Sequence, residues 1–342
     1  MENIEEGKGR KILINGSRQV YAAPGISLLQ ALKENDIFLS SACGGHGICG
    51  LCRVHVPEGA DSAFTPAELA HLSPAEQQDN IRLACQVKLS RDLRISIPEK
   101  FFHIREYRAV VSSVRSLTGS IREVVLELVK PETINFKSGQ YIQLRIPPYP
   151  GKRRMVYRAY SIASAPSDGR HVELEIGYAR NGLATTFIFE HLKTGQVMSF
   201  NGPHGDFRLS DGGRDMVMIA GGSGLAPMKS MLCDMRDRNI TRKVRLFFGA
   251  RSPAEIFHAD LMASLERTLP DFKFIPTVAA KNPEEKWKGE IGLVTGVLDR
   301  RLEDNFNGEA YLCGSPAMIE ACLEILRRKK IPEERIFYDK FA

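Results

Sequence analysis

The sequence predicts a multidomain chain of α+β and α/β type, in which a small mixed domain, an antiparallel β-barrel and a parallel α/β domain follow one another. The main observation is that the spacing of apolar residues changes twice, near residue 104 and near residue 210. The length agrees, because 342 residues suffice for two or three separate cores. A content of 43% hydrophobic and 26% charged residues is typical of soluble globular proteins. We therefore expect domains at 1–100, 104–209 and 210–342.

The first hundred residues predict a β-grasp domain. Two alternating runs within 10–23 meet at Asn15-Gly16, a strong signal for the tight turn of a β-hairpin. A helix is expected over 28–35, short helices over 65–80 and a last strand over 93–97. A hairpin, a helix, a long loop and returning strands are the elements of this small mixed fold.

The loop of this domain contains a cysteine pattern typical of a metal cluster. Within 41–53, Cys43, Cys49 and Cys52 form a C-x5-C-x2-C run, and Cys85 returns from a distance. Three clustered thiolates and a distant one are the ligand set of a [2Fe–2S] cluster of the plant-ferredoxin type. Four glycines within the run agree, because a loop wrapped around a cluster needs positive φ angles and close backbone N–H groups.

The residues alone leave other uses of these cysteines open. A structural zinc site built on four cysteines usually shows two C-x2-C pairs, whereas this chain has one, and reduced core cysteines are a further alternative. A Rieske centre needs two histidines as ligands, but with four cysteines present we expect His46 and His55 to be ordinary loop and strand residues. The other cysteines are scattered, which fits a reducing, cytoplasmic location; they are Cys233, Cys313 and Cys322.

Several classes of protein are disfavoured. The first 20 residues are charged and have no signal-peptide core, and no apolar run approaches the roughly 18 residues that span a bilayer. The net charge of +6 comes without a basic stripe interleaved with aromatic residues. We therefore expect no integral membrane segment and no nucleic-acid partner.

Residues 105–209 predict an antiparallel β-barrel, because six short strands alternate with clusters of Pro, Gly, Ser and Asn. One helix is expected over 184–192. The motif Arg158-Ala159-Tyr160-Ser161 ends a strand, and Gly182-Leu183-Ala184-Thr185-Thr186 opens the helix, where free N–H groups favour a phosphate. Taken singly, each motif is weak, since such residues are more often structural.

From residue 211 onward, strands alternate with helices, which predicts a parallel sheet covered on both faces, as in Rossmann-like domains. The turn Gly221–Pro227 joins a buried strand to a helix, which is the geometry that cradles a pyrophosphate, although it is not the G-x-G-x-x-G fingerprint. A plain tight turn is the alternative. Cys313 and Gly314 end a later strand of the same sheet, at the edge where open α/β sheets bind ligands.

The order of these motifs resembles the ferredoxin–NAD(P)+ reductase superfamily. R-x-Y-S at 158–161, G-x-x-T-T at 182–186, G-P-x-G-x-F at 202–207, G-G-x-G-x-x-P at 221–227 and C-G-x-P at 313–316 follow its pattern. With the N-terminal ferredoxin domain, the chain resembles the iron–sulfur flavoprotein reductases. Among these reductases, the chain resembles the flavoprotein family of the Na+-translocating NADH:quinone reductase. The likeness lies in the C-x5-C spacing and in the ending IFYDKF.

The resemblance implies an FAD site in the barrel domain. The residues that it implies for FAD are Arg158, Tyr160, Ser161, Gly182, Thr185, Thr186 and Phe341. Arg158 would bind the pyrophosphate together with the two threonines, and Tyr160 would stack on the isoalloxazine. Ser161 would act in catalysis by a hydrogen bond near flavin N5. Phe341 would cover the other flavin face and move for hydride transfer.

The resemblance also implies a nicotinamide nucleotide site in the last domain. Its residues would be Gly221, Gly222, Gly224, Pro227, Arg251, Glu255, Cys313 and Gly314. The glycine turn would bind the pyrophosphate, and Cys313 would lie beside the nicotinamide. An acidic residue such as Glu255 suits a ribose 2′-hydroxyl, whereas readers of a 2′-phosphate prefer paired basic groups. Arg251 alone could serve either nucleotide, so we expect NADH rather than NADPH.

The expected function is electron transfer from NADH to FAD, to the [2Fe–2S] cluster and then to a redox partner protein. The flavoproteins of the Na+-translocating reductase begin with a membrane helix, which is not predicted here, so a soluble relative with another acceptor is expected. His46 and Ile48, at the rim of the cysteine loop, are expected to help the partner dock. Two alternatives stay open, namely the reductase component of a multicomponent oxygenase and a cluster-bearing redox sensor without turnover.

Overall fold

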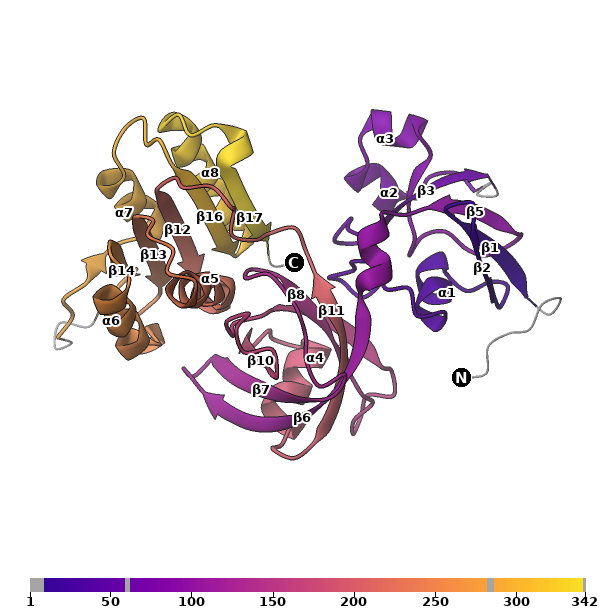
Figure 1. Cartoon of the computed structure of the whole chain (residues 1–342), viewed down its shortest axis with the longest axis horizontal. Helices are drawn as coiled ribbons and strands as arrows, with labels where there is room; N and C mark the ends of the chain where they lie inside the picture. The colour runs from indigo at the N-terminus through magenta and orange to yellow at the C-terminus, as the bar shows by residue number, and fades with distance from the viewer. Residues whose placement is uncertain (1–8, 59–61, 282–285, 341–342) are drawn as a thin grey trace.

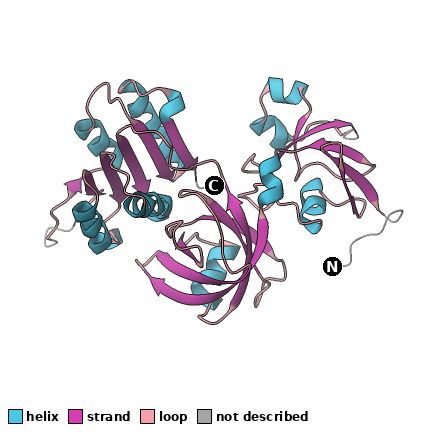
Figure 2. Cartoon of the chain, in the orientation of Figure 1, coloured by secondary structure: helices cyan, strands magenta, loops and turns pink. Residues whose placement is uncertain are grey.

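A computed structural model describes residues 9–58, 62–281 and 286–340, and it folds into three β-sheets that follow one another along the chain. The barrel lies between the N-terminal domain and the C-terminal α/β domain, as Figure 1 shows. Helices lie on both faces of the C-terminal sheet (Figure 2). The predicted fold class of α+β and α/β domains is confirmed.

The N-terminal domain has a five-stranded sheet in the order β2-β1-β5-β3-β4. The strands are β1 (Arg10–Ile14), β2 (Arg18–Ala22), β3 (Arg53–Glu58), β4 (Ile81–Leu83) and β5 (Leu93–Ser96). The helices are α1 (Leu28–Glu34), α2 (Pro66–His71) and α3 (Pro74–Gln78). Asn15 and Gly16 both have positive φ, as the predicted hairpin turn requires. The three-residue strand β4 was not predicted, and it positions Cys85 two residues after its end.

The barrel is a six-stranded antiparallel sheet in the order β10-β7-β6-β11-β8-β9. Its strands are β6 (Arg105–Ser116), β7 (Ile121–Lys130), β8 (Tyr141–Ile146), β9 (Val156–Ser161), β10 (His171–Gly177) and β11 (Val197–His204). An antiparallel bridge between Ile162 and Leu174 joins its two edges. The helix expected over 184–192 is a short α-helix, α4 (Leu183–Thr186), followed by a π-helical turn, η2 (Phe187–His191).

The C-terminal domain is a parallel sheet in the order β15-β14-β13-β12-β16-β17. Its strands are β12 (Met216–Gly221), β13 (Val244–Ala250), β14 (Phe272–Val278), β15 (Glu290–Ile291), β16 (Glu309–Gly314) and β17 (Ile336–Lys340). Its helices are α5 (Leu225–Asp237), α6 (Ala259–Thr268), α7 (Val294–Arg301) and α8 (Pro316–Arg328). The order reverses beside β12, which makes the edge between β12 and β16 a topological switch point.

Alternate residues of the central strands feed two separate cores, which explains why both faces carry helices. Met218 and Phe248 pack on the side of α5 and α6, whereas Val217 and Phe247 pack on the side of α7 and α8. Strands buried on both faces read as continuous apolar runs, as predicted for this sheet.

Within the part of the chain that the structure describes, no helix combines the length and the apolar character needed to cross a membrane.

Candidate functional site

The four predicted cluster ligands come together at one end of the N-terminal domain. The Sγ atoms of Cys43 and Cys49 lie 3.4 Å apart, and Cys52 forms a second pair with Cys85 through a hydrogen bond between their thiols. Cys43, Cys52 and Cys85 are buried, and Cys49 is partly exposed. The loop thus brings all four thiols to one place.

The backbone of the loop surrounds these sulfurs with donors. A hydrogen bond from the Cys49 thiol holds the pKa of Cys43 well below its usual range, and hydrogen bonds from three backbone N–H groups of the loop lower it further. The glycines that permit this path all have positive φ; they are Gly44, Gly45, Gly47 and Gly50. N–H groups aimed at sulfur stabilise thiolates, which are the form that binds iron.

The pairing of the sulfurs favours two metal ions over one. Among the described residues, the one group of three or more metal-binding side chains whose ligand atoms all lie within 4.8 Å of one another is Glu123, Glu173 and His258. In the same described part of the chain, no three cysteine sulfurs converge in that way, as they would around a single tetrahedral zinc. Two pairs of thiols match the four-cysteine ligation of a [2Fe–2S] cluster.

Strand β9, which carries the predicted flavin-binding motif, lies directly against the cluster loop. Arg158 Nη1 donates to the backbone oxygen of Cys43 at 3.4 Å and to that of Tyr157 at 2.8 Å. Within the described chain, Arg158 forms no ion pair, so its charge is not neutralised by an acid. The Tyr160 hydroxyl is buried without a hydrogen-bond partner in the described structure, and burial raises its pKa. An uncompensated cation beside an orphaned hydroxyl fits a bound anionic ligand such as FAD.

At 182–186, the Thr185 side chain, which was expected to bind the pyrophosphate of FAD, already has hydrogen-bond partners within the protein. Thr185 Oγ1 donates to the backbone oxygen of Ala179 at 3.0 Å and accepts from its N–H at 3.2 Å. The Thr185 hydroxyl therefore closes the preceding turn, and Gly182 is required there because a Cβ would lie 2.7 Å from that hydroxyl. Thr186, the last residue of α4, is less buried than Thr185.

Four of the predicted nucleotide residues of the third domain line one pocket of about 520 Å³. They are Gly221 and Gly222 at the end of β12, and Arg251 and Glu255 after β13. Barrel residues complete the wall, with Tyr178 45% exposed there. The pocket therefore lies between barrel and α/β domain, where a nicotinamide must reach a flavin.

One glycine of this turn is sterically required. A Cβ on Gly224 would lie 2.2 Å from the backbone oxygen of Cys313, whereas one on Gly221 would meet only the flexible side chain of Met318, at 2.7 Å from its Sδ. Gly224 thus allows the turn after β12 to pack against the end of β16, at the switch point. Pro227 is buried within the first turn of α5.

Five predicted residues are placed as follows. Arg251 Nε donates to Glu255 Oε1 at 2.8 Å, so the acid and the base expected to choose the nucleotide form a pair. Cys313 is fully buried in the hydrophobic core and does not line the pocket, and burial raises the pKa of its thiol. Gly314 ends the same strand, with φ of 155°. Phe341 lies outside the described residues, directly after β17.

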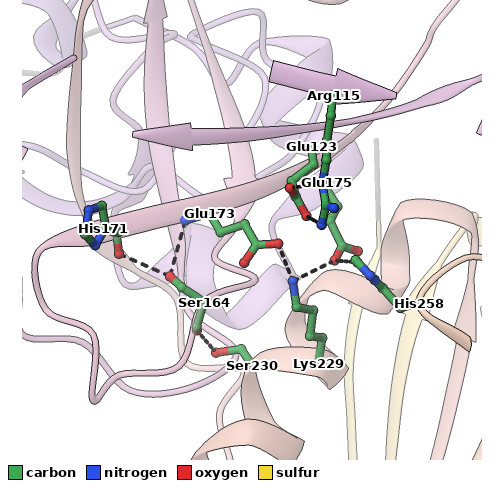
Figure 3. A network of polar contacts seen from close by, with 9 residues as sticks. All are labelled: Arg115, Glu123, Ser164, His171, Glu173, Glu175, Lys229, Ser230 and His258. Atoms are coloured by element: carbon green, nitrogen blue, oxygen red, sulfur yellow. Dashed lines mark hydrogen bonds and ion pairs between the residues drawn. The ribbon is translucent and has the colours of Figure 1, made fainter. Parts of the chain in front are cut away.

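A buried charged network joins the barrel to the α/β domain and was missed by sequence reasoning (Figure 3). Lys229 of α5 forms an ion pair with Glu173 of β10, and its Nζ lies 3.6 Å from Glu175 Oε1. His258 Nε2 lies 2.8 Å from the same Glu175 oxygen. Alternation along β10 gave no signal for this role, since it is also typical of a solvent-facing edge.

A second missed feature is a stacked pair in the barrel. The rings of Tyr141 and His204 are 5.3 Å apart and nearly parallel. His204 Nε2 lies 2.6 Å from Asn201 Oδ1, and its buried Nδ1 has no partner in the described structure. Burial lowers the pKa of His204 to about 3, so this ring is neutral near pH 7. His204 belongs to the G-P-x-G-x-F motif, which is the one signal that could have marked it.

Family models cover the three domains in succession. The 2Fe-2S iron-sulfur cluster binding domain matches residues 12–90, and the oxidoreductase FAD-binding domain matches residues 108–209. The oxidoreductase NAD-binding domain matches residues 218–324. The chain therefore has domains for [2Fe–2S], FAD and a nicotinamide nucleotide.

Relatives are similar over nearly their whole length. The Na(+)-translocating NADH-quinone reductase of Methylococcus capsulatus has a component that is 32% identical over 97% of this chain and 91% of its own length. The reductase component of phenol 2-monooxygenase from a Pseudomonas species is 34% identical over 93% and 90%.

Solved structures agree. The Amycolatopsis cytochrome P450 reductase GcoB has a TM-score of 0.79 and 29% identity, and covers 97% of this chain and 98% of that one. The ferredoxin reductase of carbazole 1,9a-dioxygenase has a TM-score of 0.74 and 28% identity over the same shares. The predicted resemblance is confirmed, and the chain belongs to the iron–sulfur flavoprotein reductases of the ferredoxin–NAD(P)+ reductase superfamily, which pass electrons from NADH through FAD and a [2Fe–2S] cluster to an acceptor.

Proposed function

We propose that this chain is a cytoplasmic NADH-dependent reductase whose final acceptor is a protein that docks at the rim of the cluster loop. The observation that carries the proposal is the contact between Arg158 Nη1 and the backbone oxygen of Cys43, at 3.4 Å. This contact joins the strand that carries the flavin-binding motif to the loop that carries the cluster ligands. Electrons must pass from the flavin to the cluster, so the two sites have to be neighbours. When bound, FAD supplies the change from the two-electron chemistry of NADH to the one-electron chemistry of the cluster.

The flavin site that we propose is formed on β9 and on the helix start at 182–186. Arg158 binds the pyrophosphate of FAD, since its guanidinium has no acidic partner in the described chain. Tyr160 lies along the isoalloxazine. Ser161, which is 6% exposed, is the last residue of the same strand, and its hydroxyl forms a hydrogen bond near flavin N5. Thr186 and the N–H groups of the helix start hold the phosphates, while Thr185 maintains the turn.

The nucleotide site that we propose is the pocket at the switch point. Gly221, Gly222 and Gly224 let the pyrophosphate approach the backbone at the start of α5, whose first turn contains Pro227. Glu255, with Arg251 bound to it, accepts from the ribose hydroxyls of NADH, and this carboxylate disfavours a 2′-phosphate. Cys313 and Gly314 end β16 directly before Ser315, which lines the pocket, and we assign Cys313 a place beside the nicotinamide. Phe341, which follows β17 in the sequence, covers the flavin.

The acceptor surface that we propose is the exposed part of the cluster loop. Ile48 is 62% exposed and Leu51 41% exposed, which is unusual for apolar side chains beside a metal ligand. His46, between Gly45 and Gly47 in the sequence, is exposed as well. A terminal oxygenase is the acceptor class favoured by the likeness to oxygenase reductases over whole chain lengths. A reducing cytoplasm is supported by the need for four free thiols to bind iron.

Exchange of the two rim residues tests the docking surface. We expect His46→Ala with Ile48→Ser to weaken turnover with the protein acceptor while NADH–ferricyanide reduction stays at the wild-type rate. Val129→Ser, at another exposed apolar position, is the matched control because it lies on β7 of the barrel and does not line the nucleotide pocket. If both activities fell together, the rim would serve the cluster and not the partner.

A further inference from the structure

The N-terminal domain meets the barrel through a small set of contacts made by β8, β9 and their neighbours. Gln143 Nε2 donates to the backbone oxygen of Leu39 at 3.0 Å in a buried hydrogen bond. Lys33 Nζ lies 2.8 Å from the centre of the Tyr157 ring. These contacts, with Arg158 on Cys43, form what we call the cluster seam.

Within this seam, one glycine of the cluster loop lies directly against the backbone of the barrel. Gly44 follows the ligand Cys43 and has φ of 68°. A Cβ at this position would lie 2.7 Å from the backbone oxygen of Tyr157 and 3.1 Å from Arg158 Nη1. Real Cβ atoms essentially never come within 3.0 Å of another heavy atom, and this oxygen belongs to a strand paired with β8, so it cannot give way cheaply.

The other glycines of the loop face their own domain. A Cβ on Gly45 would meet Leu29 Cδ2 at 3.4 Å, which is ordinary contact, and one on Gly50 would meet His71. A Cβ on Gly47 would meet the side chains of Gln86 and Ala67. All four glycines provide the positive φ that wraps the loop, but Gly44 alone of the four would strike the barrel. The missing side chain at Gly44 therefore has a use that cluster wrapping does not explain.

We propose that Gly44 is a positioning residue for electron transfer: its lack of a side chain lets the backbone that holds the cluster rest on the flavin-binding strand, and the Gln143–Leu39 hydrogen bond keeps it there. This inference rests on the proposed function, since it takes β9 as part of the flavin site. Each NADH brings two electrons as hydride, and the cluster takes one at a time, so two electrons cross the seam per NADH oxidised and the proton is released to solvent. The distance across the seam then sets the rate of each crossing.

A methyl group at Gly44 must push the two domains apart until the contact relaxes from 2.7 Å to 3.4 Å or more. Electron transfer between two cofactors slows as the gap between them widens, so we expect Gly44→Ala to slow cluster reduction severalfold. The nucleotide pocket is lined by none of the residues that form the seam, so the reduction of flavin by NADH should keep its wild-type rate.

The experiment compares Gly44→Ala with Gly45→Ala in the fully loaded protein. Both variants place a methyl group on a positive-φ residue of the same loop, so both carry the backbone strain, but only the first meets the barrel. Anaerobic stopped-flow absorbance follows flavin reduction by NADH, and rapid-freeze EPR follows the cluster. EPR of the dithionite-reduced variants shows whether the cluster itself is intact.

A readout independent of turnover is hydrogen–deuterium exchange over 39–46 and 155–160, which should rise in Gly44→Ala and not in Gly45→Ala. Equal slowing in both variants, or wild-type cluster reduction in Gly44→Ala, would overturn the proposal. If Gly44→Ala fails to hold a cluster, Gln143→Leu decides, because that residue lies away from the ligands; slower cluster reduction supports the seam and an unchanged rate overturns it. If wild-type protein shows no flavin reduction by NADH, the proposed function is wrong, while equal exchange in the two glycine variants would separately refute the seam.

Discussion

The barrel contacts its two neighbours in opposite ways. Toward the α/β domain, it buries a network of charged side chains around Lys229, Glu173 and Glu175. Toward the N-terminal domain, the contacts are the backbone oxygen of Tyr157 facing Gly44 of the cluster loop, one buried amide hydrogen bond, and Lys33 of the N-terminal domain over the Tyr157 ring. One interface is defined by charge and the other by close backbone approach.

This difference matches what has to cross each interface. Hydride transfer requires the nicotinamide and the flavin to meet in one geometry, and a network of buried ion pairs fixes orientation because each charge must find its partner. Electron transfer to a cluster requires short distance more than orientation, and backbone contact provides the shortest distance available to two domains. The four predictions below test this contrast, from the largest expected effect to the smallest.

Removing the cluster should abolish electron transfer to a protein acceptor and leave the reduction of the flavin by NADH intact. Cys85→Ser deletes one of four ligands, so we expect iron content and reduction of a protein acceptor to fall to background, because a [2Fe–2S] cluster needs all four. NADH–ferricyanide reduction by the flavin half should persist. Cys233→Ser is the control, since that buried cysteine lies on α5 away from the loop. Loss of flavin reduction in Cys85→Ser would mean that the halves are not separable.

Breaking the charged interface should cost much stability. Lys229→Met leaves Glu173 and Glu175 buried without their cation, and removal of one partner from such a pair costs about 3–5 kcal/mol. We expect the thermal unfolding midpoint to fall by about 10 °C. The exposed Lys273→Met should change the free energy of unfolding by less than about 0.5 kcal/mol. If Lys229→Met were as stable as wild type, the network would carry no orienting force.

The same interface should weaken as pH rises from about 4.5 to 7. Burial, together with a hydrogen bond to Glu123, raises the pKa of Glu173 to about 7 from its ordinary 4.5. Between these values the folded state holds a proton that the unfolded state has released, so the stability is full below pH 4.5 and is lost toward pH 7. The loss should be about 1–3 kcal/mol. Glu173→Gln should remove this slope, and an identical pH profile in the variant would contradict the assignment.

The cluster seam should respond to pH in the opposite sense. Burial, followed by repulsion from Arg145, lowers the pKa of Lys33 to about 7 from its ordinary 10.5. Above pH 7 the unfolded chain holds a proton that the folded chain lacks, so stability should rise with pH, by about 1–2 kcal/mol between pH 7 and 9. Lys33→Met should flatten the rise. Chemical unfolding at several pH values measures it, and a rise equal to that of wild type would exclude Lys33 as its source.

Local signals in the sequence predicted most of the fold. The hairpin turn at Asn15-Gly16, the helix from Leu28 and the doubly buried strands of the third domain were all confirmed. The strands that escaped prediction are β4 and β15, which have three and two residues, and β17 at the C-terminal end. Strands as short as β4 and β15 have too few residues to show an alternating pattern, and tertiary pairing decides them.

Contacts between domains were beyond local signals. Lys229 and Glu173 are 56 positions apart, and a glutamate that alternates along a strand reads as a solvent-facing residue. Gly44 could be predicted as a loop glycine, but its contact with Tyr157 depends on how two separately folded domains dock. The assignment of the flavin and nucleotide residues stays a prediction, and the structure adds that the Thr185 hydroxyl is already used within its turn.

An anaerobic NADH titration followed by absorbance and EPR tests the central claim most directly. We predict uptake of about three electrons per chain, two by the flavin and one by the cluster, with flavin bleaching and a reduced [2Fe–2S] signal together. Flavin bleaching with no cluster signal, in protein that contains a full complement of cluster iron, would contradict the claim that the contact of β9 with the cysteine loop carries electrons from one cofactor to the other.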